Sequence, residues 1–308
     1  MRGALTSLSR GDLVMPLRSL VGLPDGSGLL GMMPGYLGEP RSFGIKVVTV
    51  MPGNHGTGYE SHQGVVMLFG VERGEPLAIL DGSAITAIRT AAASAVATDV
   101  LARKDAGDLA LIGSGTQART HLAAMNAVRP LRRVRIWSRS RANAERFARE
   151  QGDLLDVHLE VAATGEEAVR GADLVCTTTG SKEPVLRGDW LDSGAHVNAV
   201  GSCFPASREL DGAAVRRARL YTDCRESCEK EAGDFLIARD EGSIGAGHLR
   251  GEIGEVMLGR VAGRTAPDEI TVYESLGVAV EDLAAAHAIH RRALETGEGN
   301  WLEWGGPA

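Results

Sequence analysis

The second half of the chain alternates short apolar runs with stretches of helical composition. Apolar runs of three to five residues that are each followed by a longer mixed segment predict strands and helices in turn. The predicted strands are 109–112, 133–137, 174–177, 196–200, 219–221 and 270–273, and helices are predicted at 116–128, at 141–150 and from 164. Because each helix must return the chain to the same edge of the sheet, this order predicts a doubly wound α/β domain with a parallel sheet.

The first hundred residues have a different pattern. They are rich in glycine and proline, and short β-like runs at 45–50 and 65–69 lie between turn signals, which predicts a smaller, mostly antiparallel sheet. An alanine-rich helix is predicted over 85–103, with a hinge at 104–107, and a helix over 278–292 could return to the first domain. We therefore expect a discontinuous domain of residues 1–98 and 279–308 and a second domain of residues 99–278.

Composition narrows the class of protein. A chain of 308 residues suits two domains, and a net charge of −7 argues against nucleic acid or an anionic membrane as a partner. We find no signal-peptide core and no apolar run that approaches membrane-spanning length. Four cysteines make no disulfide framework, and Cys224 and Cys228 have no paired histidine, so we expect a cytoplasmic protein without a metal site.

A glycine-rich turn follows the first strand of the second domain. Residues 113–118 fit the pattern G-x-G-x-x-[G/A], and they stand between a predicted strand and a predicted helix. Gly113 permits a tight turn, Gly115 lets the backbone approach a pyrophosphate, and Ala118 keeps the helix close to the strand. Free amides at the helix start would face the phosphates. The alternative is a plain glycine turn, but the surrounding strands and helices favour a Rossmann dinucleotide site.

The end of the second strand indicates which nicotinamide dinucleotide is bound. An acidic residue there accepts hydrogen bonds from the ribose hydroxyls of NAD and repels a 2′-phosphate. This chain instead has Ser138, Arg139 and Ser140, followed by Arg141. Two hydroxyls and a guanidinium suit a phosphate monoester, so we predict NADP, with NAD still possible. Alternatively, both arginines are solvent-facing loop charges.

Six segments in chain order resemble the ornithine cyclodeaminase/mu-crystallin family. They are Gly-Ile-Lys-Val-Val at 44–48, Ser-His-Gln-Gly at 61–64, Ile-Thr-Ala-Ile-Arg-Thr-Ala-Ala at 85–92, the turn at 113–118, Asn-Ala-Val-Gly at 198–201 and Ser-Leu-Gly-Val-Ala-Val-Glu-Asp at 275–282. The resemblance implies a homodimer built through the non-Rossmann domain. It also implies a substrate pocket between the domains, where an α-amino or α-imino acid meets the nicotinamide.

The resemblance also assigns roles to individual residues. Arg18, Lys46 and Arg89 match the positions that hold the substrate carboxylate, and charge-assisted hydrogen bonds suit that task. Without the family, Arg18 could be a surface residue and Lys46 the polar side of an edge strand, whereas Arg89 must leave the core or meet an anion. The cofactor residues implied by the family match, together with those of the turn and the second strand, are Thr90, Gly113, Ser114, Gly115, Thr116, Gln117, Ser138, Arg139, Ser140, Thr177, Thr178, Val200, Gly201 and Leu276.

One departure from the family pattern bears on the reaction. Cyclodeaminases of the family carry a proton-transferring Asp two residues after the glycine of the Asn-Ala-Val-Gly segment, and here Cys203 occupies that position. A thiol with a pKa near roughly 8.5 is a poor carboxylate substitute at neutral pH. We therefore predict an NAD(P)H-dependent reductase of imino acids, either cyclic ketimines such as pyrroline- or piperideine-2-carboxylate or open-chain imino acids.

Some alternatives stay open. The predicted catalytic residues are Lys46, Arg89 and Arg18, with His62 as the best guess for a proton donor if one is needed, although a histidine in a turn is more often structural. Cys203 would line the substrate. An NAD-dependent amino acid cyclodeaminase and a non-catalytic NADPH-dependent binding protein are the competing functions.

Overall fold

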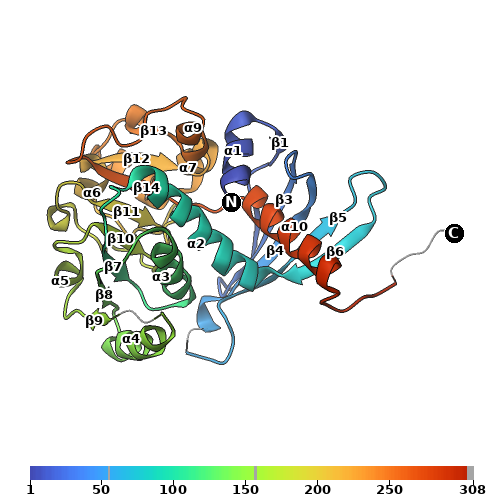
Figure 1. Cartoon of the computed structure of the whole chain (residues 1–308), viewed down its shortest axis with the longest axis horizontal. Coiled ribbons are helices and arrows are strands. Elements are labelled where there is room, and N and C mark those ends of the chain that lie inside the picture. The colour runs from blue at the N-terminus through green and yellow to red at the C-terminus, as the bar shows by residue number, and fades with distance from the viewer. Residues whose placement is uncertain (55, 156–157, 304–308) are drawn as a thin grey trace. The chain divides into compact units, whose positions relative to one another are not determined.

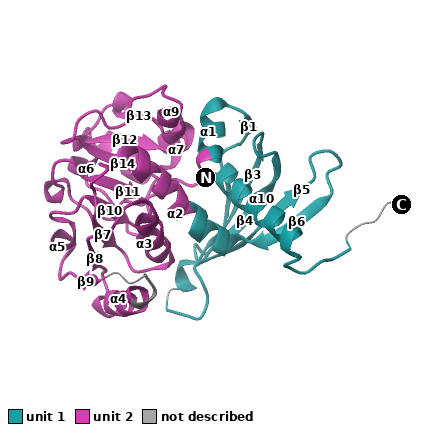
Figure 2. Ribbon diagram, viewed as in Figure 1, with its two compact units in different colours: residues 1, 3–89, 278–308 teal, residues 2, 90–277 magenta. Residues whose placement is uncertain are grey.

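A computed structural model of the chain describes residues 1–54, 56–155 and 158–303. The chain divides into two compact units (Figure 2). Unit 1 comprises Met1, Gly3–Arg89 and Val278–Ala308, and unit 2 comprises Arg2 and Thr90–Gly277. The division falls within helix α2 (Gly82–Leu101), so this one helix belongs to both units.

Unit 2 is a doubly wound α/β unit. Its eight strands are all parallel, in the order β13-β12-β14-β11-β10-β7-β8-β9 (Figure 1). The strands are β7 (Asp108–Ile112), β8 (Arg133–Trp137), β9 (Leu159–Val161), β10 (Leu174–Thr177), β11 (His196–Ala199), β12 (Ala218–Thr222), β13 (Leu249–Glu252) and β14 (Ile270–Glu274). The predicted fold class is confirmed.

Helices connect these strands. They are α3 (Thr116–Val128), α4 (Arg141–Leu155), α5 (Gly165–Val169), α6 (Gly212–Arg217), α7 (Arg225–Glu231), α8 (Gly233–Asp240) and α9 (Ile253–Met257), with short 3₁₀ turns at Gly188–Trp190 and Ala246–His248. The Thr164 side chain caps α5 by accepting from the Glu167 amide at 3.0 Å, as the Thr-x-x-Glu sequence predicts.

The continuous apolar runs of unit 2 are explained by burial on both faces of its sheet. On β7, Leu109 and Leu111 belong to one hydrophobic cluster, whereas Ala110 and Ile112 belong to another. Successive strand side chains point to opposite faces, so a strand covered on both sides must be apolar at every position. The sheet order reverses at β7, with β8 on one side and β10 on the other, which is where open α/β sheets bind ligands.

Unit 1 is built on a six-stranded antiparallel sheet. Strands β1 (Leu13–Val14), β3 (Leu29–Leu37), β4 (Ser42–Val50), β5 (His62–Phe69) and β6 (Pro76–Asp81) lie in that order, and β2 (Ser19–Gly22) also pairs with β3. Helix α10 (Ala279–Thr296) packs on one face, where Leu283 meets Val66, Leu68 and Ile85. Unit 1 also contains α1 (Arg2–Arg10), whose Arg2 is grouped with unit 2, and a 3₁₀ turn at Pro52–Asn54.

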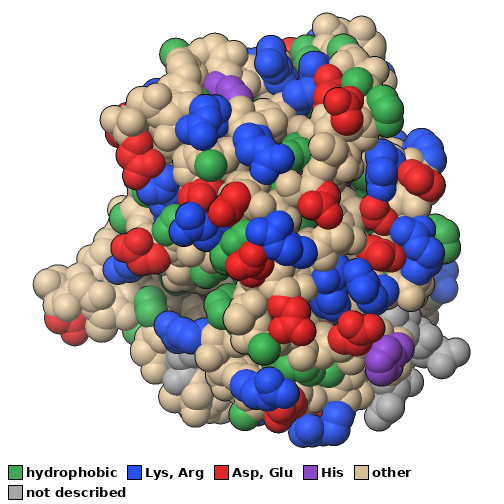
Figure 3. All heavy atoms as spheres, turned by 90° about the vertical axis from the view of Figure 1, so that its left-hand side faces the viewer, with side chains coloured by type: hydrophobic (Ala, Val, Ile, Leu, Met, Phe, Trp, Pro, Cys, Tyr) green, Lys and Arg blue, Asp and Glu red, His purple; other side chains and the backbone are tan. Residues whose placement is uncertain are grey.

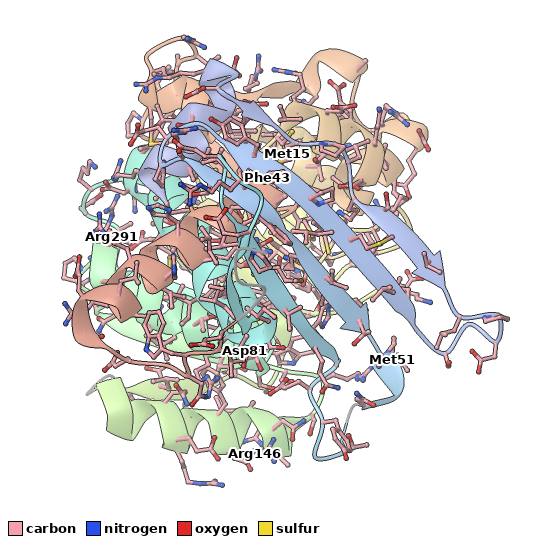
Figure 4. All side chains as sticks on the ribbon, turned by 90° about the vertical axis from the view of Figure 1, so that its right-hand side faces the viewer. Met15, Phe43, Met51, Asp81, Arg146 and Arg291 are labelled. Atoms are coloured by element: carbon pink, nitrogen blue, oxygen red, sulfur yellow. The ribbon has the colours of Figure 1, made fainter. Side chains whose placement is uncertain are left out.

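The opposite face of this sheet carries exposed apolar side chains. Phe43 is 45% exposed, Leu77 is 44% exposed and Ile79 is 56% exposed. They alternate with inward-facing residues such as Lys46 on β4. Figure 4 shows the strands with their side chains, with Phe43 toward one end of the sheet and Met51 and Asp81 toward the other. We call the face that carries Phe43, Val65, Leu77 and Ile79 the outer face.

Two helices differ from the sequence expectations. Helix α1 was not expected, but Leu5 and Leu8 stand one helical turn apart and are buried, which is the signature of a one-sided helix. Helix α2 begins at Gly82, earlier than predicted, because the Asp81 carboxylate accepts hydrogen bonds from the amides of Ser83 and Ala84. Contrary to the sequence analysis, α2 is long and apolar enough to cross a membrane by length and composition, although most of its apolar window is buried.

Candidate active site

Two buried cations and two buried carboxylates meet in unit 1. The ammonium nitrogen of Lys46, on β4, lies 2.6 Å from Oδ2 of Asp282. The Arg89 guanidinium, on α2, donates from Nε to Oδ1 of Asp282 and from Nη1 to Oε2 of Glu281, each at 2.8 Å. All four side chains are at most 5% exposed. We call this group the clamp.

Local structure explains how each member reaches the clamp. Lys46 occupies an inward position of β4, two residues from Gly44, where α10 lies close enough that an added Cβ would be 3.0 Å from Leu283. Glu281 and Asp282 stand in the first turn of α10, where the positive end of the helix dipole favours carboxylates. Buried charges survive only in pairs, so the two acids permit the two cations to leave water.

Arg18 and His62 also lie near Lys46. The charge of Arg18 contributes to lowering the pKa of Lys46, and the charge of Lys46 contributes to lowering the pKa of His62. The structure therefore brings together the four residues that were predicted to be catalytic. Nδ1 of His62 is 3.0 Å from the hydroxyl of Ser61, and more than a third of the His62 surface remains accessible within the chain.

Burial dominates the electrostatics of the clamp. It lowers the pKa of Lys46 to about 8 even though Asp282 acts in the opposite direction. Burial alone would raise the pKa of Asp282, but the charges of Arg89 and Lys46 hold it below its ordinary value. The partial burial of the His62 ring lowers its pKa below the ordinary value, and the charge of Lys46 acts in the same direction.

The two carboxylates of the clamp were missed by the sequence analysis. Glu281 and Asp282 were noted as part of the family motif but were given no role. A signal was present, because two adjacent acids stand in the first turn of a helix between Val280 and Leu283, which are both buried. Acids at such positions require a cationic partner, although the sequence does not say which one.

The predicted cofactor residues of unit 2 gather at the carboxyl edge of its sheet. The turn at 113–117 follows β7, Ser138 follows β8, Thr178 follows β10, Val200 and Gly201 follow β11, and Leu276 lies two residues beyond β14. Thr177 is the last residue of β10. Thr90, on α2, is buried. Cys203 is half-buried and packs against the core of unit 2.

The glycine-rich turn has a shape that suits a dinucleotide. Gly113 has a φ of 116°, and a Cβ there would lie 2.7 Å from the Thr178 hydroxyl. Gly115 is the N-cap of α3, no side chain caps this helix, and a Cβ on Gly115 would meet open space. Gly115 itself offers no capping side chain, and the backbone at Gly115 is open to a phosphate. These residues fit a pyrophosphate.

The segment that follows β8 is accessible. The Ser114 hydroxyl donates to the Ser138 hydroxyl at 3.0 Å, which links the glycine-rich turn to the end of β8. Arg139 and Ser140 are exposed. Arg141 donates to Glu145 one turn along α4 at 2.8 Å, so its charge is already partly neutralised. Arg139 is thus better placed than Arg141 to meet a phosphate on the ribose.

A dinucleotide-binding α/β unit joined to an antiparallel unit with a buried cationic clamp defines a two-unit protein of the nicotinamide oxidoreductase class. The sequence model of the ornithine cyclodeaminase/mu-crystallin family matches residues 1–297, and the chain belongs to this family. The resemblance stated from the sequence is confirmed.

Named relatives and a solved structure agree with this placement. The ketimine reductase mu-crystallin of Mus musculus is 39% identical over 294 residues, which cover 94% of this chain and 90% of the relative. A Delta(1)-pyrroline-2-carboxylate reductase of Bacillus cereus is 37% identical over 302 residues, which cover 98% of this chain and 93% of the relative. The Thermococcus litoralis Delta(1)-pyrroline-2-carboxylate reductase, solved in complex with NADH and L-proline, has a TM-score of 0.95 and 36% identity over 98% of this chain and 93% of that chain.

Proposed function

We propose that the protein is an NAD(P)H-dependent reductase that converts imino acids to amino acids. Cyclic ketimines such as pyrroline- and piperideine-2-carboxylate are the first substrate class, and open-chain imino acids are the second. The grouping of Lys46 and Arg89, with Arg18 near Lys46, carries this proposal, because cationic side chains suit the single carboxylate that all these substrates share. The similarity to a ketimine reductase and to pyrroline-2-carboxylate reductases supports the same chemistry.

The carboxyl edge of the unit 2 sheet would hold the cofactor. The amides of Gly115, Thr116 and Gln117 would meet the pyrophosphate, and the segments around Thr178, Gly201 and Leu276 would border the nicotinamide and its ribose. When bound, the reduced nicotinamide supplies a hydride to the imine carbon. We propose NADP as the preferred form, because the end of β8 has no acidic residue and presents an exposed Arg139.

The clamp would bind and orient the substrate. Arg18, Lys46 and Arg89 would hold the carboxylate, which fixes the position of the adjacent imine carbon and withdraws electron density from it. Lys46 has a pKa of about 8 and therefore carries a proton at Nζ at neutral pH, which makes it a better proton source than His62, whose pKa is lowered. We further propose that unit 1 is the substrate-binding domain and unit 2 is the dinucleotide-binding domain.

We also propose that two copies of the chain associate through the outer face of unit 1. Phe43, Leu77 and Ile79 expose apolar surface that no element of unit 1 in the described ranges covers. The face of the molecule that Figure 3 shows instead carries acidic and basic side chains interspersed, as solvated surfaces do. A cytoplasmic location fits the four free cysteines.

Purified protein should be tested with cyclic and open-chain imino acids and with both reduced cofactors, following the loss of nicotinamide absorbance. Turnover of a carboxylated imine, and not of the same imine without its carboxylate, would support the proposal. Two outcomes would overturn it. Release of ammonia from ornithine with catalytic NAD would indicate a cyclodeaminase, and tight NADPH binding without any turnover would indicate a binding protein. The Cys203 thiol in place of the proton-transferring Asp disfavours the first outcome.

A further inference from the structure

One buried carboxylate in unit 2 accepts four hydrogen bonds at the carboxyl edge of the sheet. Oε1 of Glu209 accepts from the amide and the hydroxyl of Thr179, at 2.5 and 2.7 Å. Oε2 accepts from the Thr177 hydroxyl at 2.8 Å and from the Gly201 amide at 2.7 Å. The Glu209 side chain therefore ties the end of β10 to the end of β11, its neighbour in the sheet.

The residues around Glu209 permit its close approach to Gly201 and hold its backbone in place. A Cβ on Gly201 would lie 2.7 Å from Cδ of Glu209 and 1.8 Å from the carbonyl oxygen of Thr179, so only glycine permits the approach. Oδ1 of Asp234 accepts from the amides of Glu209 and Leu210, at 2.8 and 2.9 Å, which holds the backbone that carries the carboxylate. Glu209 is fully buried.

Four hydrogen-bond partners converge on two oxygens, and this arrangement favours an ionised carboxylate. A carboxylate offers about four lone-pair sites, so each of the four donors has an acceptor. Glutamine has the same shape, but its amide nitrogen would face either Thr179 or the pair formed by Thr177 and Gly201, where donors already point. Burial raises the pKa of Glu209, and the four hydrogen bonds act in the opposite direction by favouring the ionised form.

We propose that Glu209 is a positioning residue for the nicotinamide half of the cofactor. It holds the segments around Thr178 and Val200, which are predicted to border the nicotinamide and its ribose. The inference rests on the proposed function, since it assumes that a dinucleotide binds at this edge.

The test compares Glu209→Gln with Glu274→Gln, a matched change at another fully buried acid of the same unit. Glu274 accepts a hydrogen bond from the Ser202 hydroxyl at 2.5 Å, and burial raises its pKa well above the ordinary value, so glutamine resembles its protonated form. Two ligands are titrated calorimetrically against each variant. One is the reduced cofactor that the wild type binds more tightly, and the other is the matching ADP-ribose or 2′-phospho-ADP-ribose, which has no nicotinamide.

We expect Glu209→Gln to weaken the dinucleotide about tenfold or more, which is the size of one lost hydrogen bond to a charged group, and to change the affinity for the nicotinamide-free ligand less than twofold. Glu274→Gln should change neither affinity by more than twofold. A purely structural role would weaken both ligands equally, and that result, or unchanged binding of the dinucleotide, would overturn the inference.

A second variant covers the case in which Glu209→Gln does not fold. Thr179→Val removes one donor to Oε1 and keeps the Thr179 amide, so we expect a loss of dinucleotide affinity of about three- to tenfold, again without an effect on the nicotinamide-free ligand. An unchanged dinucleotide affinity in this variant would count against the inference. If the wild type binds neither NADH nor NADPH, the proposed function itself is wrong. If the wild type binds a dinucleotide but the variants weaken it no more than the nicotinamide-free ligand, only the inference about Glu209 is wrong.

Discussion

Asp282 lies 2.6 Å from the ammonium nitrogen of Lys46 and binds Arg89 through its other oxygen at 2.8 Å. One carboxylate therefore sets the spacing of two cations that were assigned to substrate binding. It also acts against burial, which disfavours the charged form of Lys46 and lowers its pKa to about 8. This relationship makes the charge on Lys46 sensitive to pH within an accessible range.

The first prediction concerns the pH dependence of substrate capture. Lys46 is protonated below a pH of about 8 and loses its charge above it, because burial has moved its pKa down from 10.5. Since the neutral amine can neither balance a carboxylate nor supply a proton, kcat/KM for the imine should fall as the pH rises past about 8. Steady-state kinetics between pH 6 and pH 10, with saturating cofactor, measure this fall in kcat/KM, which is the alkaline limb of the pH profile.

Asp282→Asn provides the control for that assignment. Asp282 raises the pKa of Lys46, so its neutral replacement should move the alkaline limb to lower pH by about one unit or more. An unmoved limb would show that Lys46 is not the group that titrates. The affinity for the reduced cofactor, measured separately, should stay the same, because Asp282 belongs to unit 1 and the predicted phosphate contacts of the turn belong to unit 2.

The second prediction concerns the stability of the clamp. Arg89→Met removes the guanidinium that binds the buried Glu281 and Asp282 and should lower the free energy of unfolding by about 3–5 kcal/mol, the usual cost of breaking a buried pair. Adding Glu281→Gln removes one of the two buried negative charges that Arg89 balanced and should recover part of that loss. Turnover should stay low in both variants, because the carboxylate contact is missing. Chemical denaturation gives the stabilities, and recovery of activity along with stability would refute a role for Arg89 in substrate binding.

The third prediction concerns cofactor choice. Ser138→Asp places a carboxylate at the end of β8, where it repels a 2′-phosphate and accepts hydrogen bonds from ribose hydroxyls. The ratio of kcat/KM for NADPH to kcat/KM for NADH should fall at least about tenfold. Arg141→Gln is the comparison, since Arg141 already pairs with Glu145, and it should leave the ratio within about twofold. An unchanged ratio in Ser138→Asp would remove the assignment of the 2′-phosphate site.

The fourth prediction concerns the outer face. Ile79 is 56% exposed on β6, so Ile79→Glu should be tolerated by the fold of one chain but should place a charge within the proposed contact between two copies. Sedimentation velocity should show a monomer for this variant and, as proposed, a dimer for the wild type. Ile289→Glu, at a 46% exposed site on α10, should leave the wild-type mass unchanged. A dimer that survives Ile79→Glu would place the contact elsewhere.

The sequence by itself determined the class of the fold and the dinucleotide turn. Strands such as 109–112 and helices such as 116–128 depend on local periodicity, and the shape of the turn depends on glycines at fixed offsets, so neighbouring residues carry the signal. The positions of Lys46 and Arg89 were available from resemblance alone.

The partners of these cations were decided by the tertiary structure. Arg89 pairs with Asp282 and Glu281 across 193 and 192 positions, and Glu209 gathers donors from two different strand ends. A buried cation requires an acidic partner, but the sequence does not identify which acid of the chain is that partner. Only the packing of α10 against the antiparallel sheet selects which acids meet which cations, because long-range pairing follows from topology and leaves no periodic trace in the sequence.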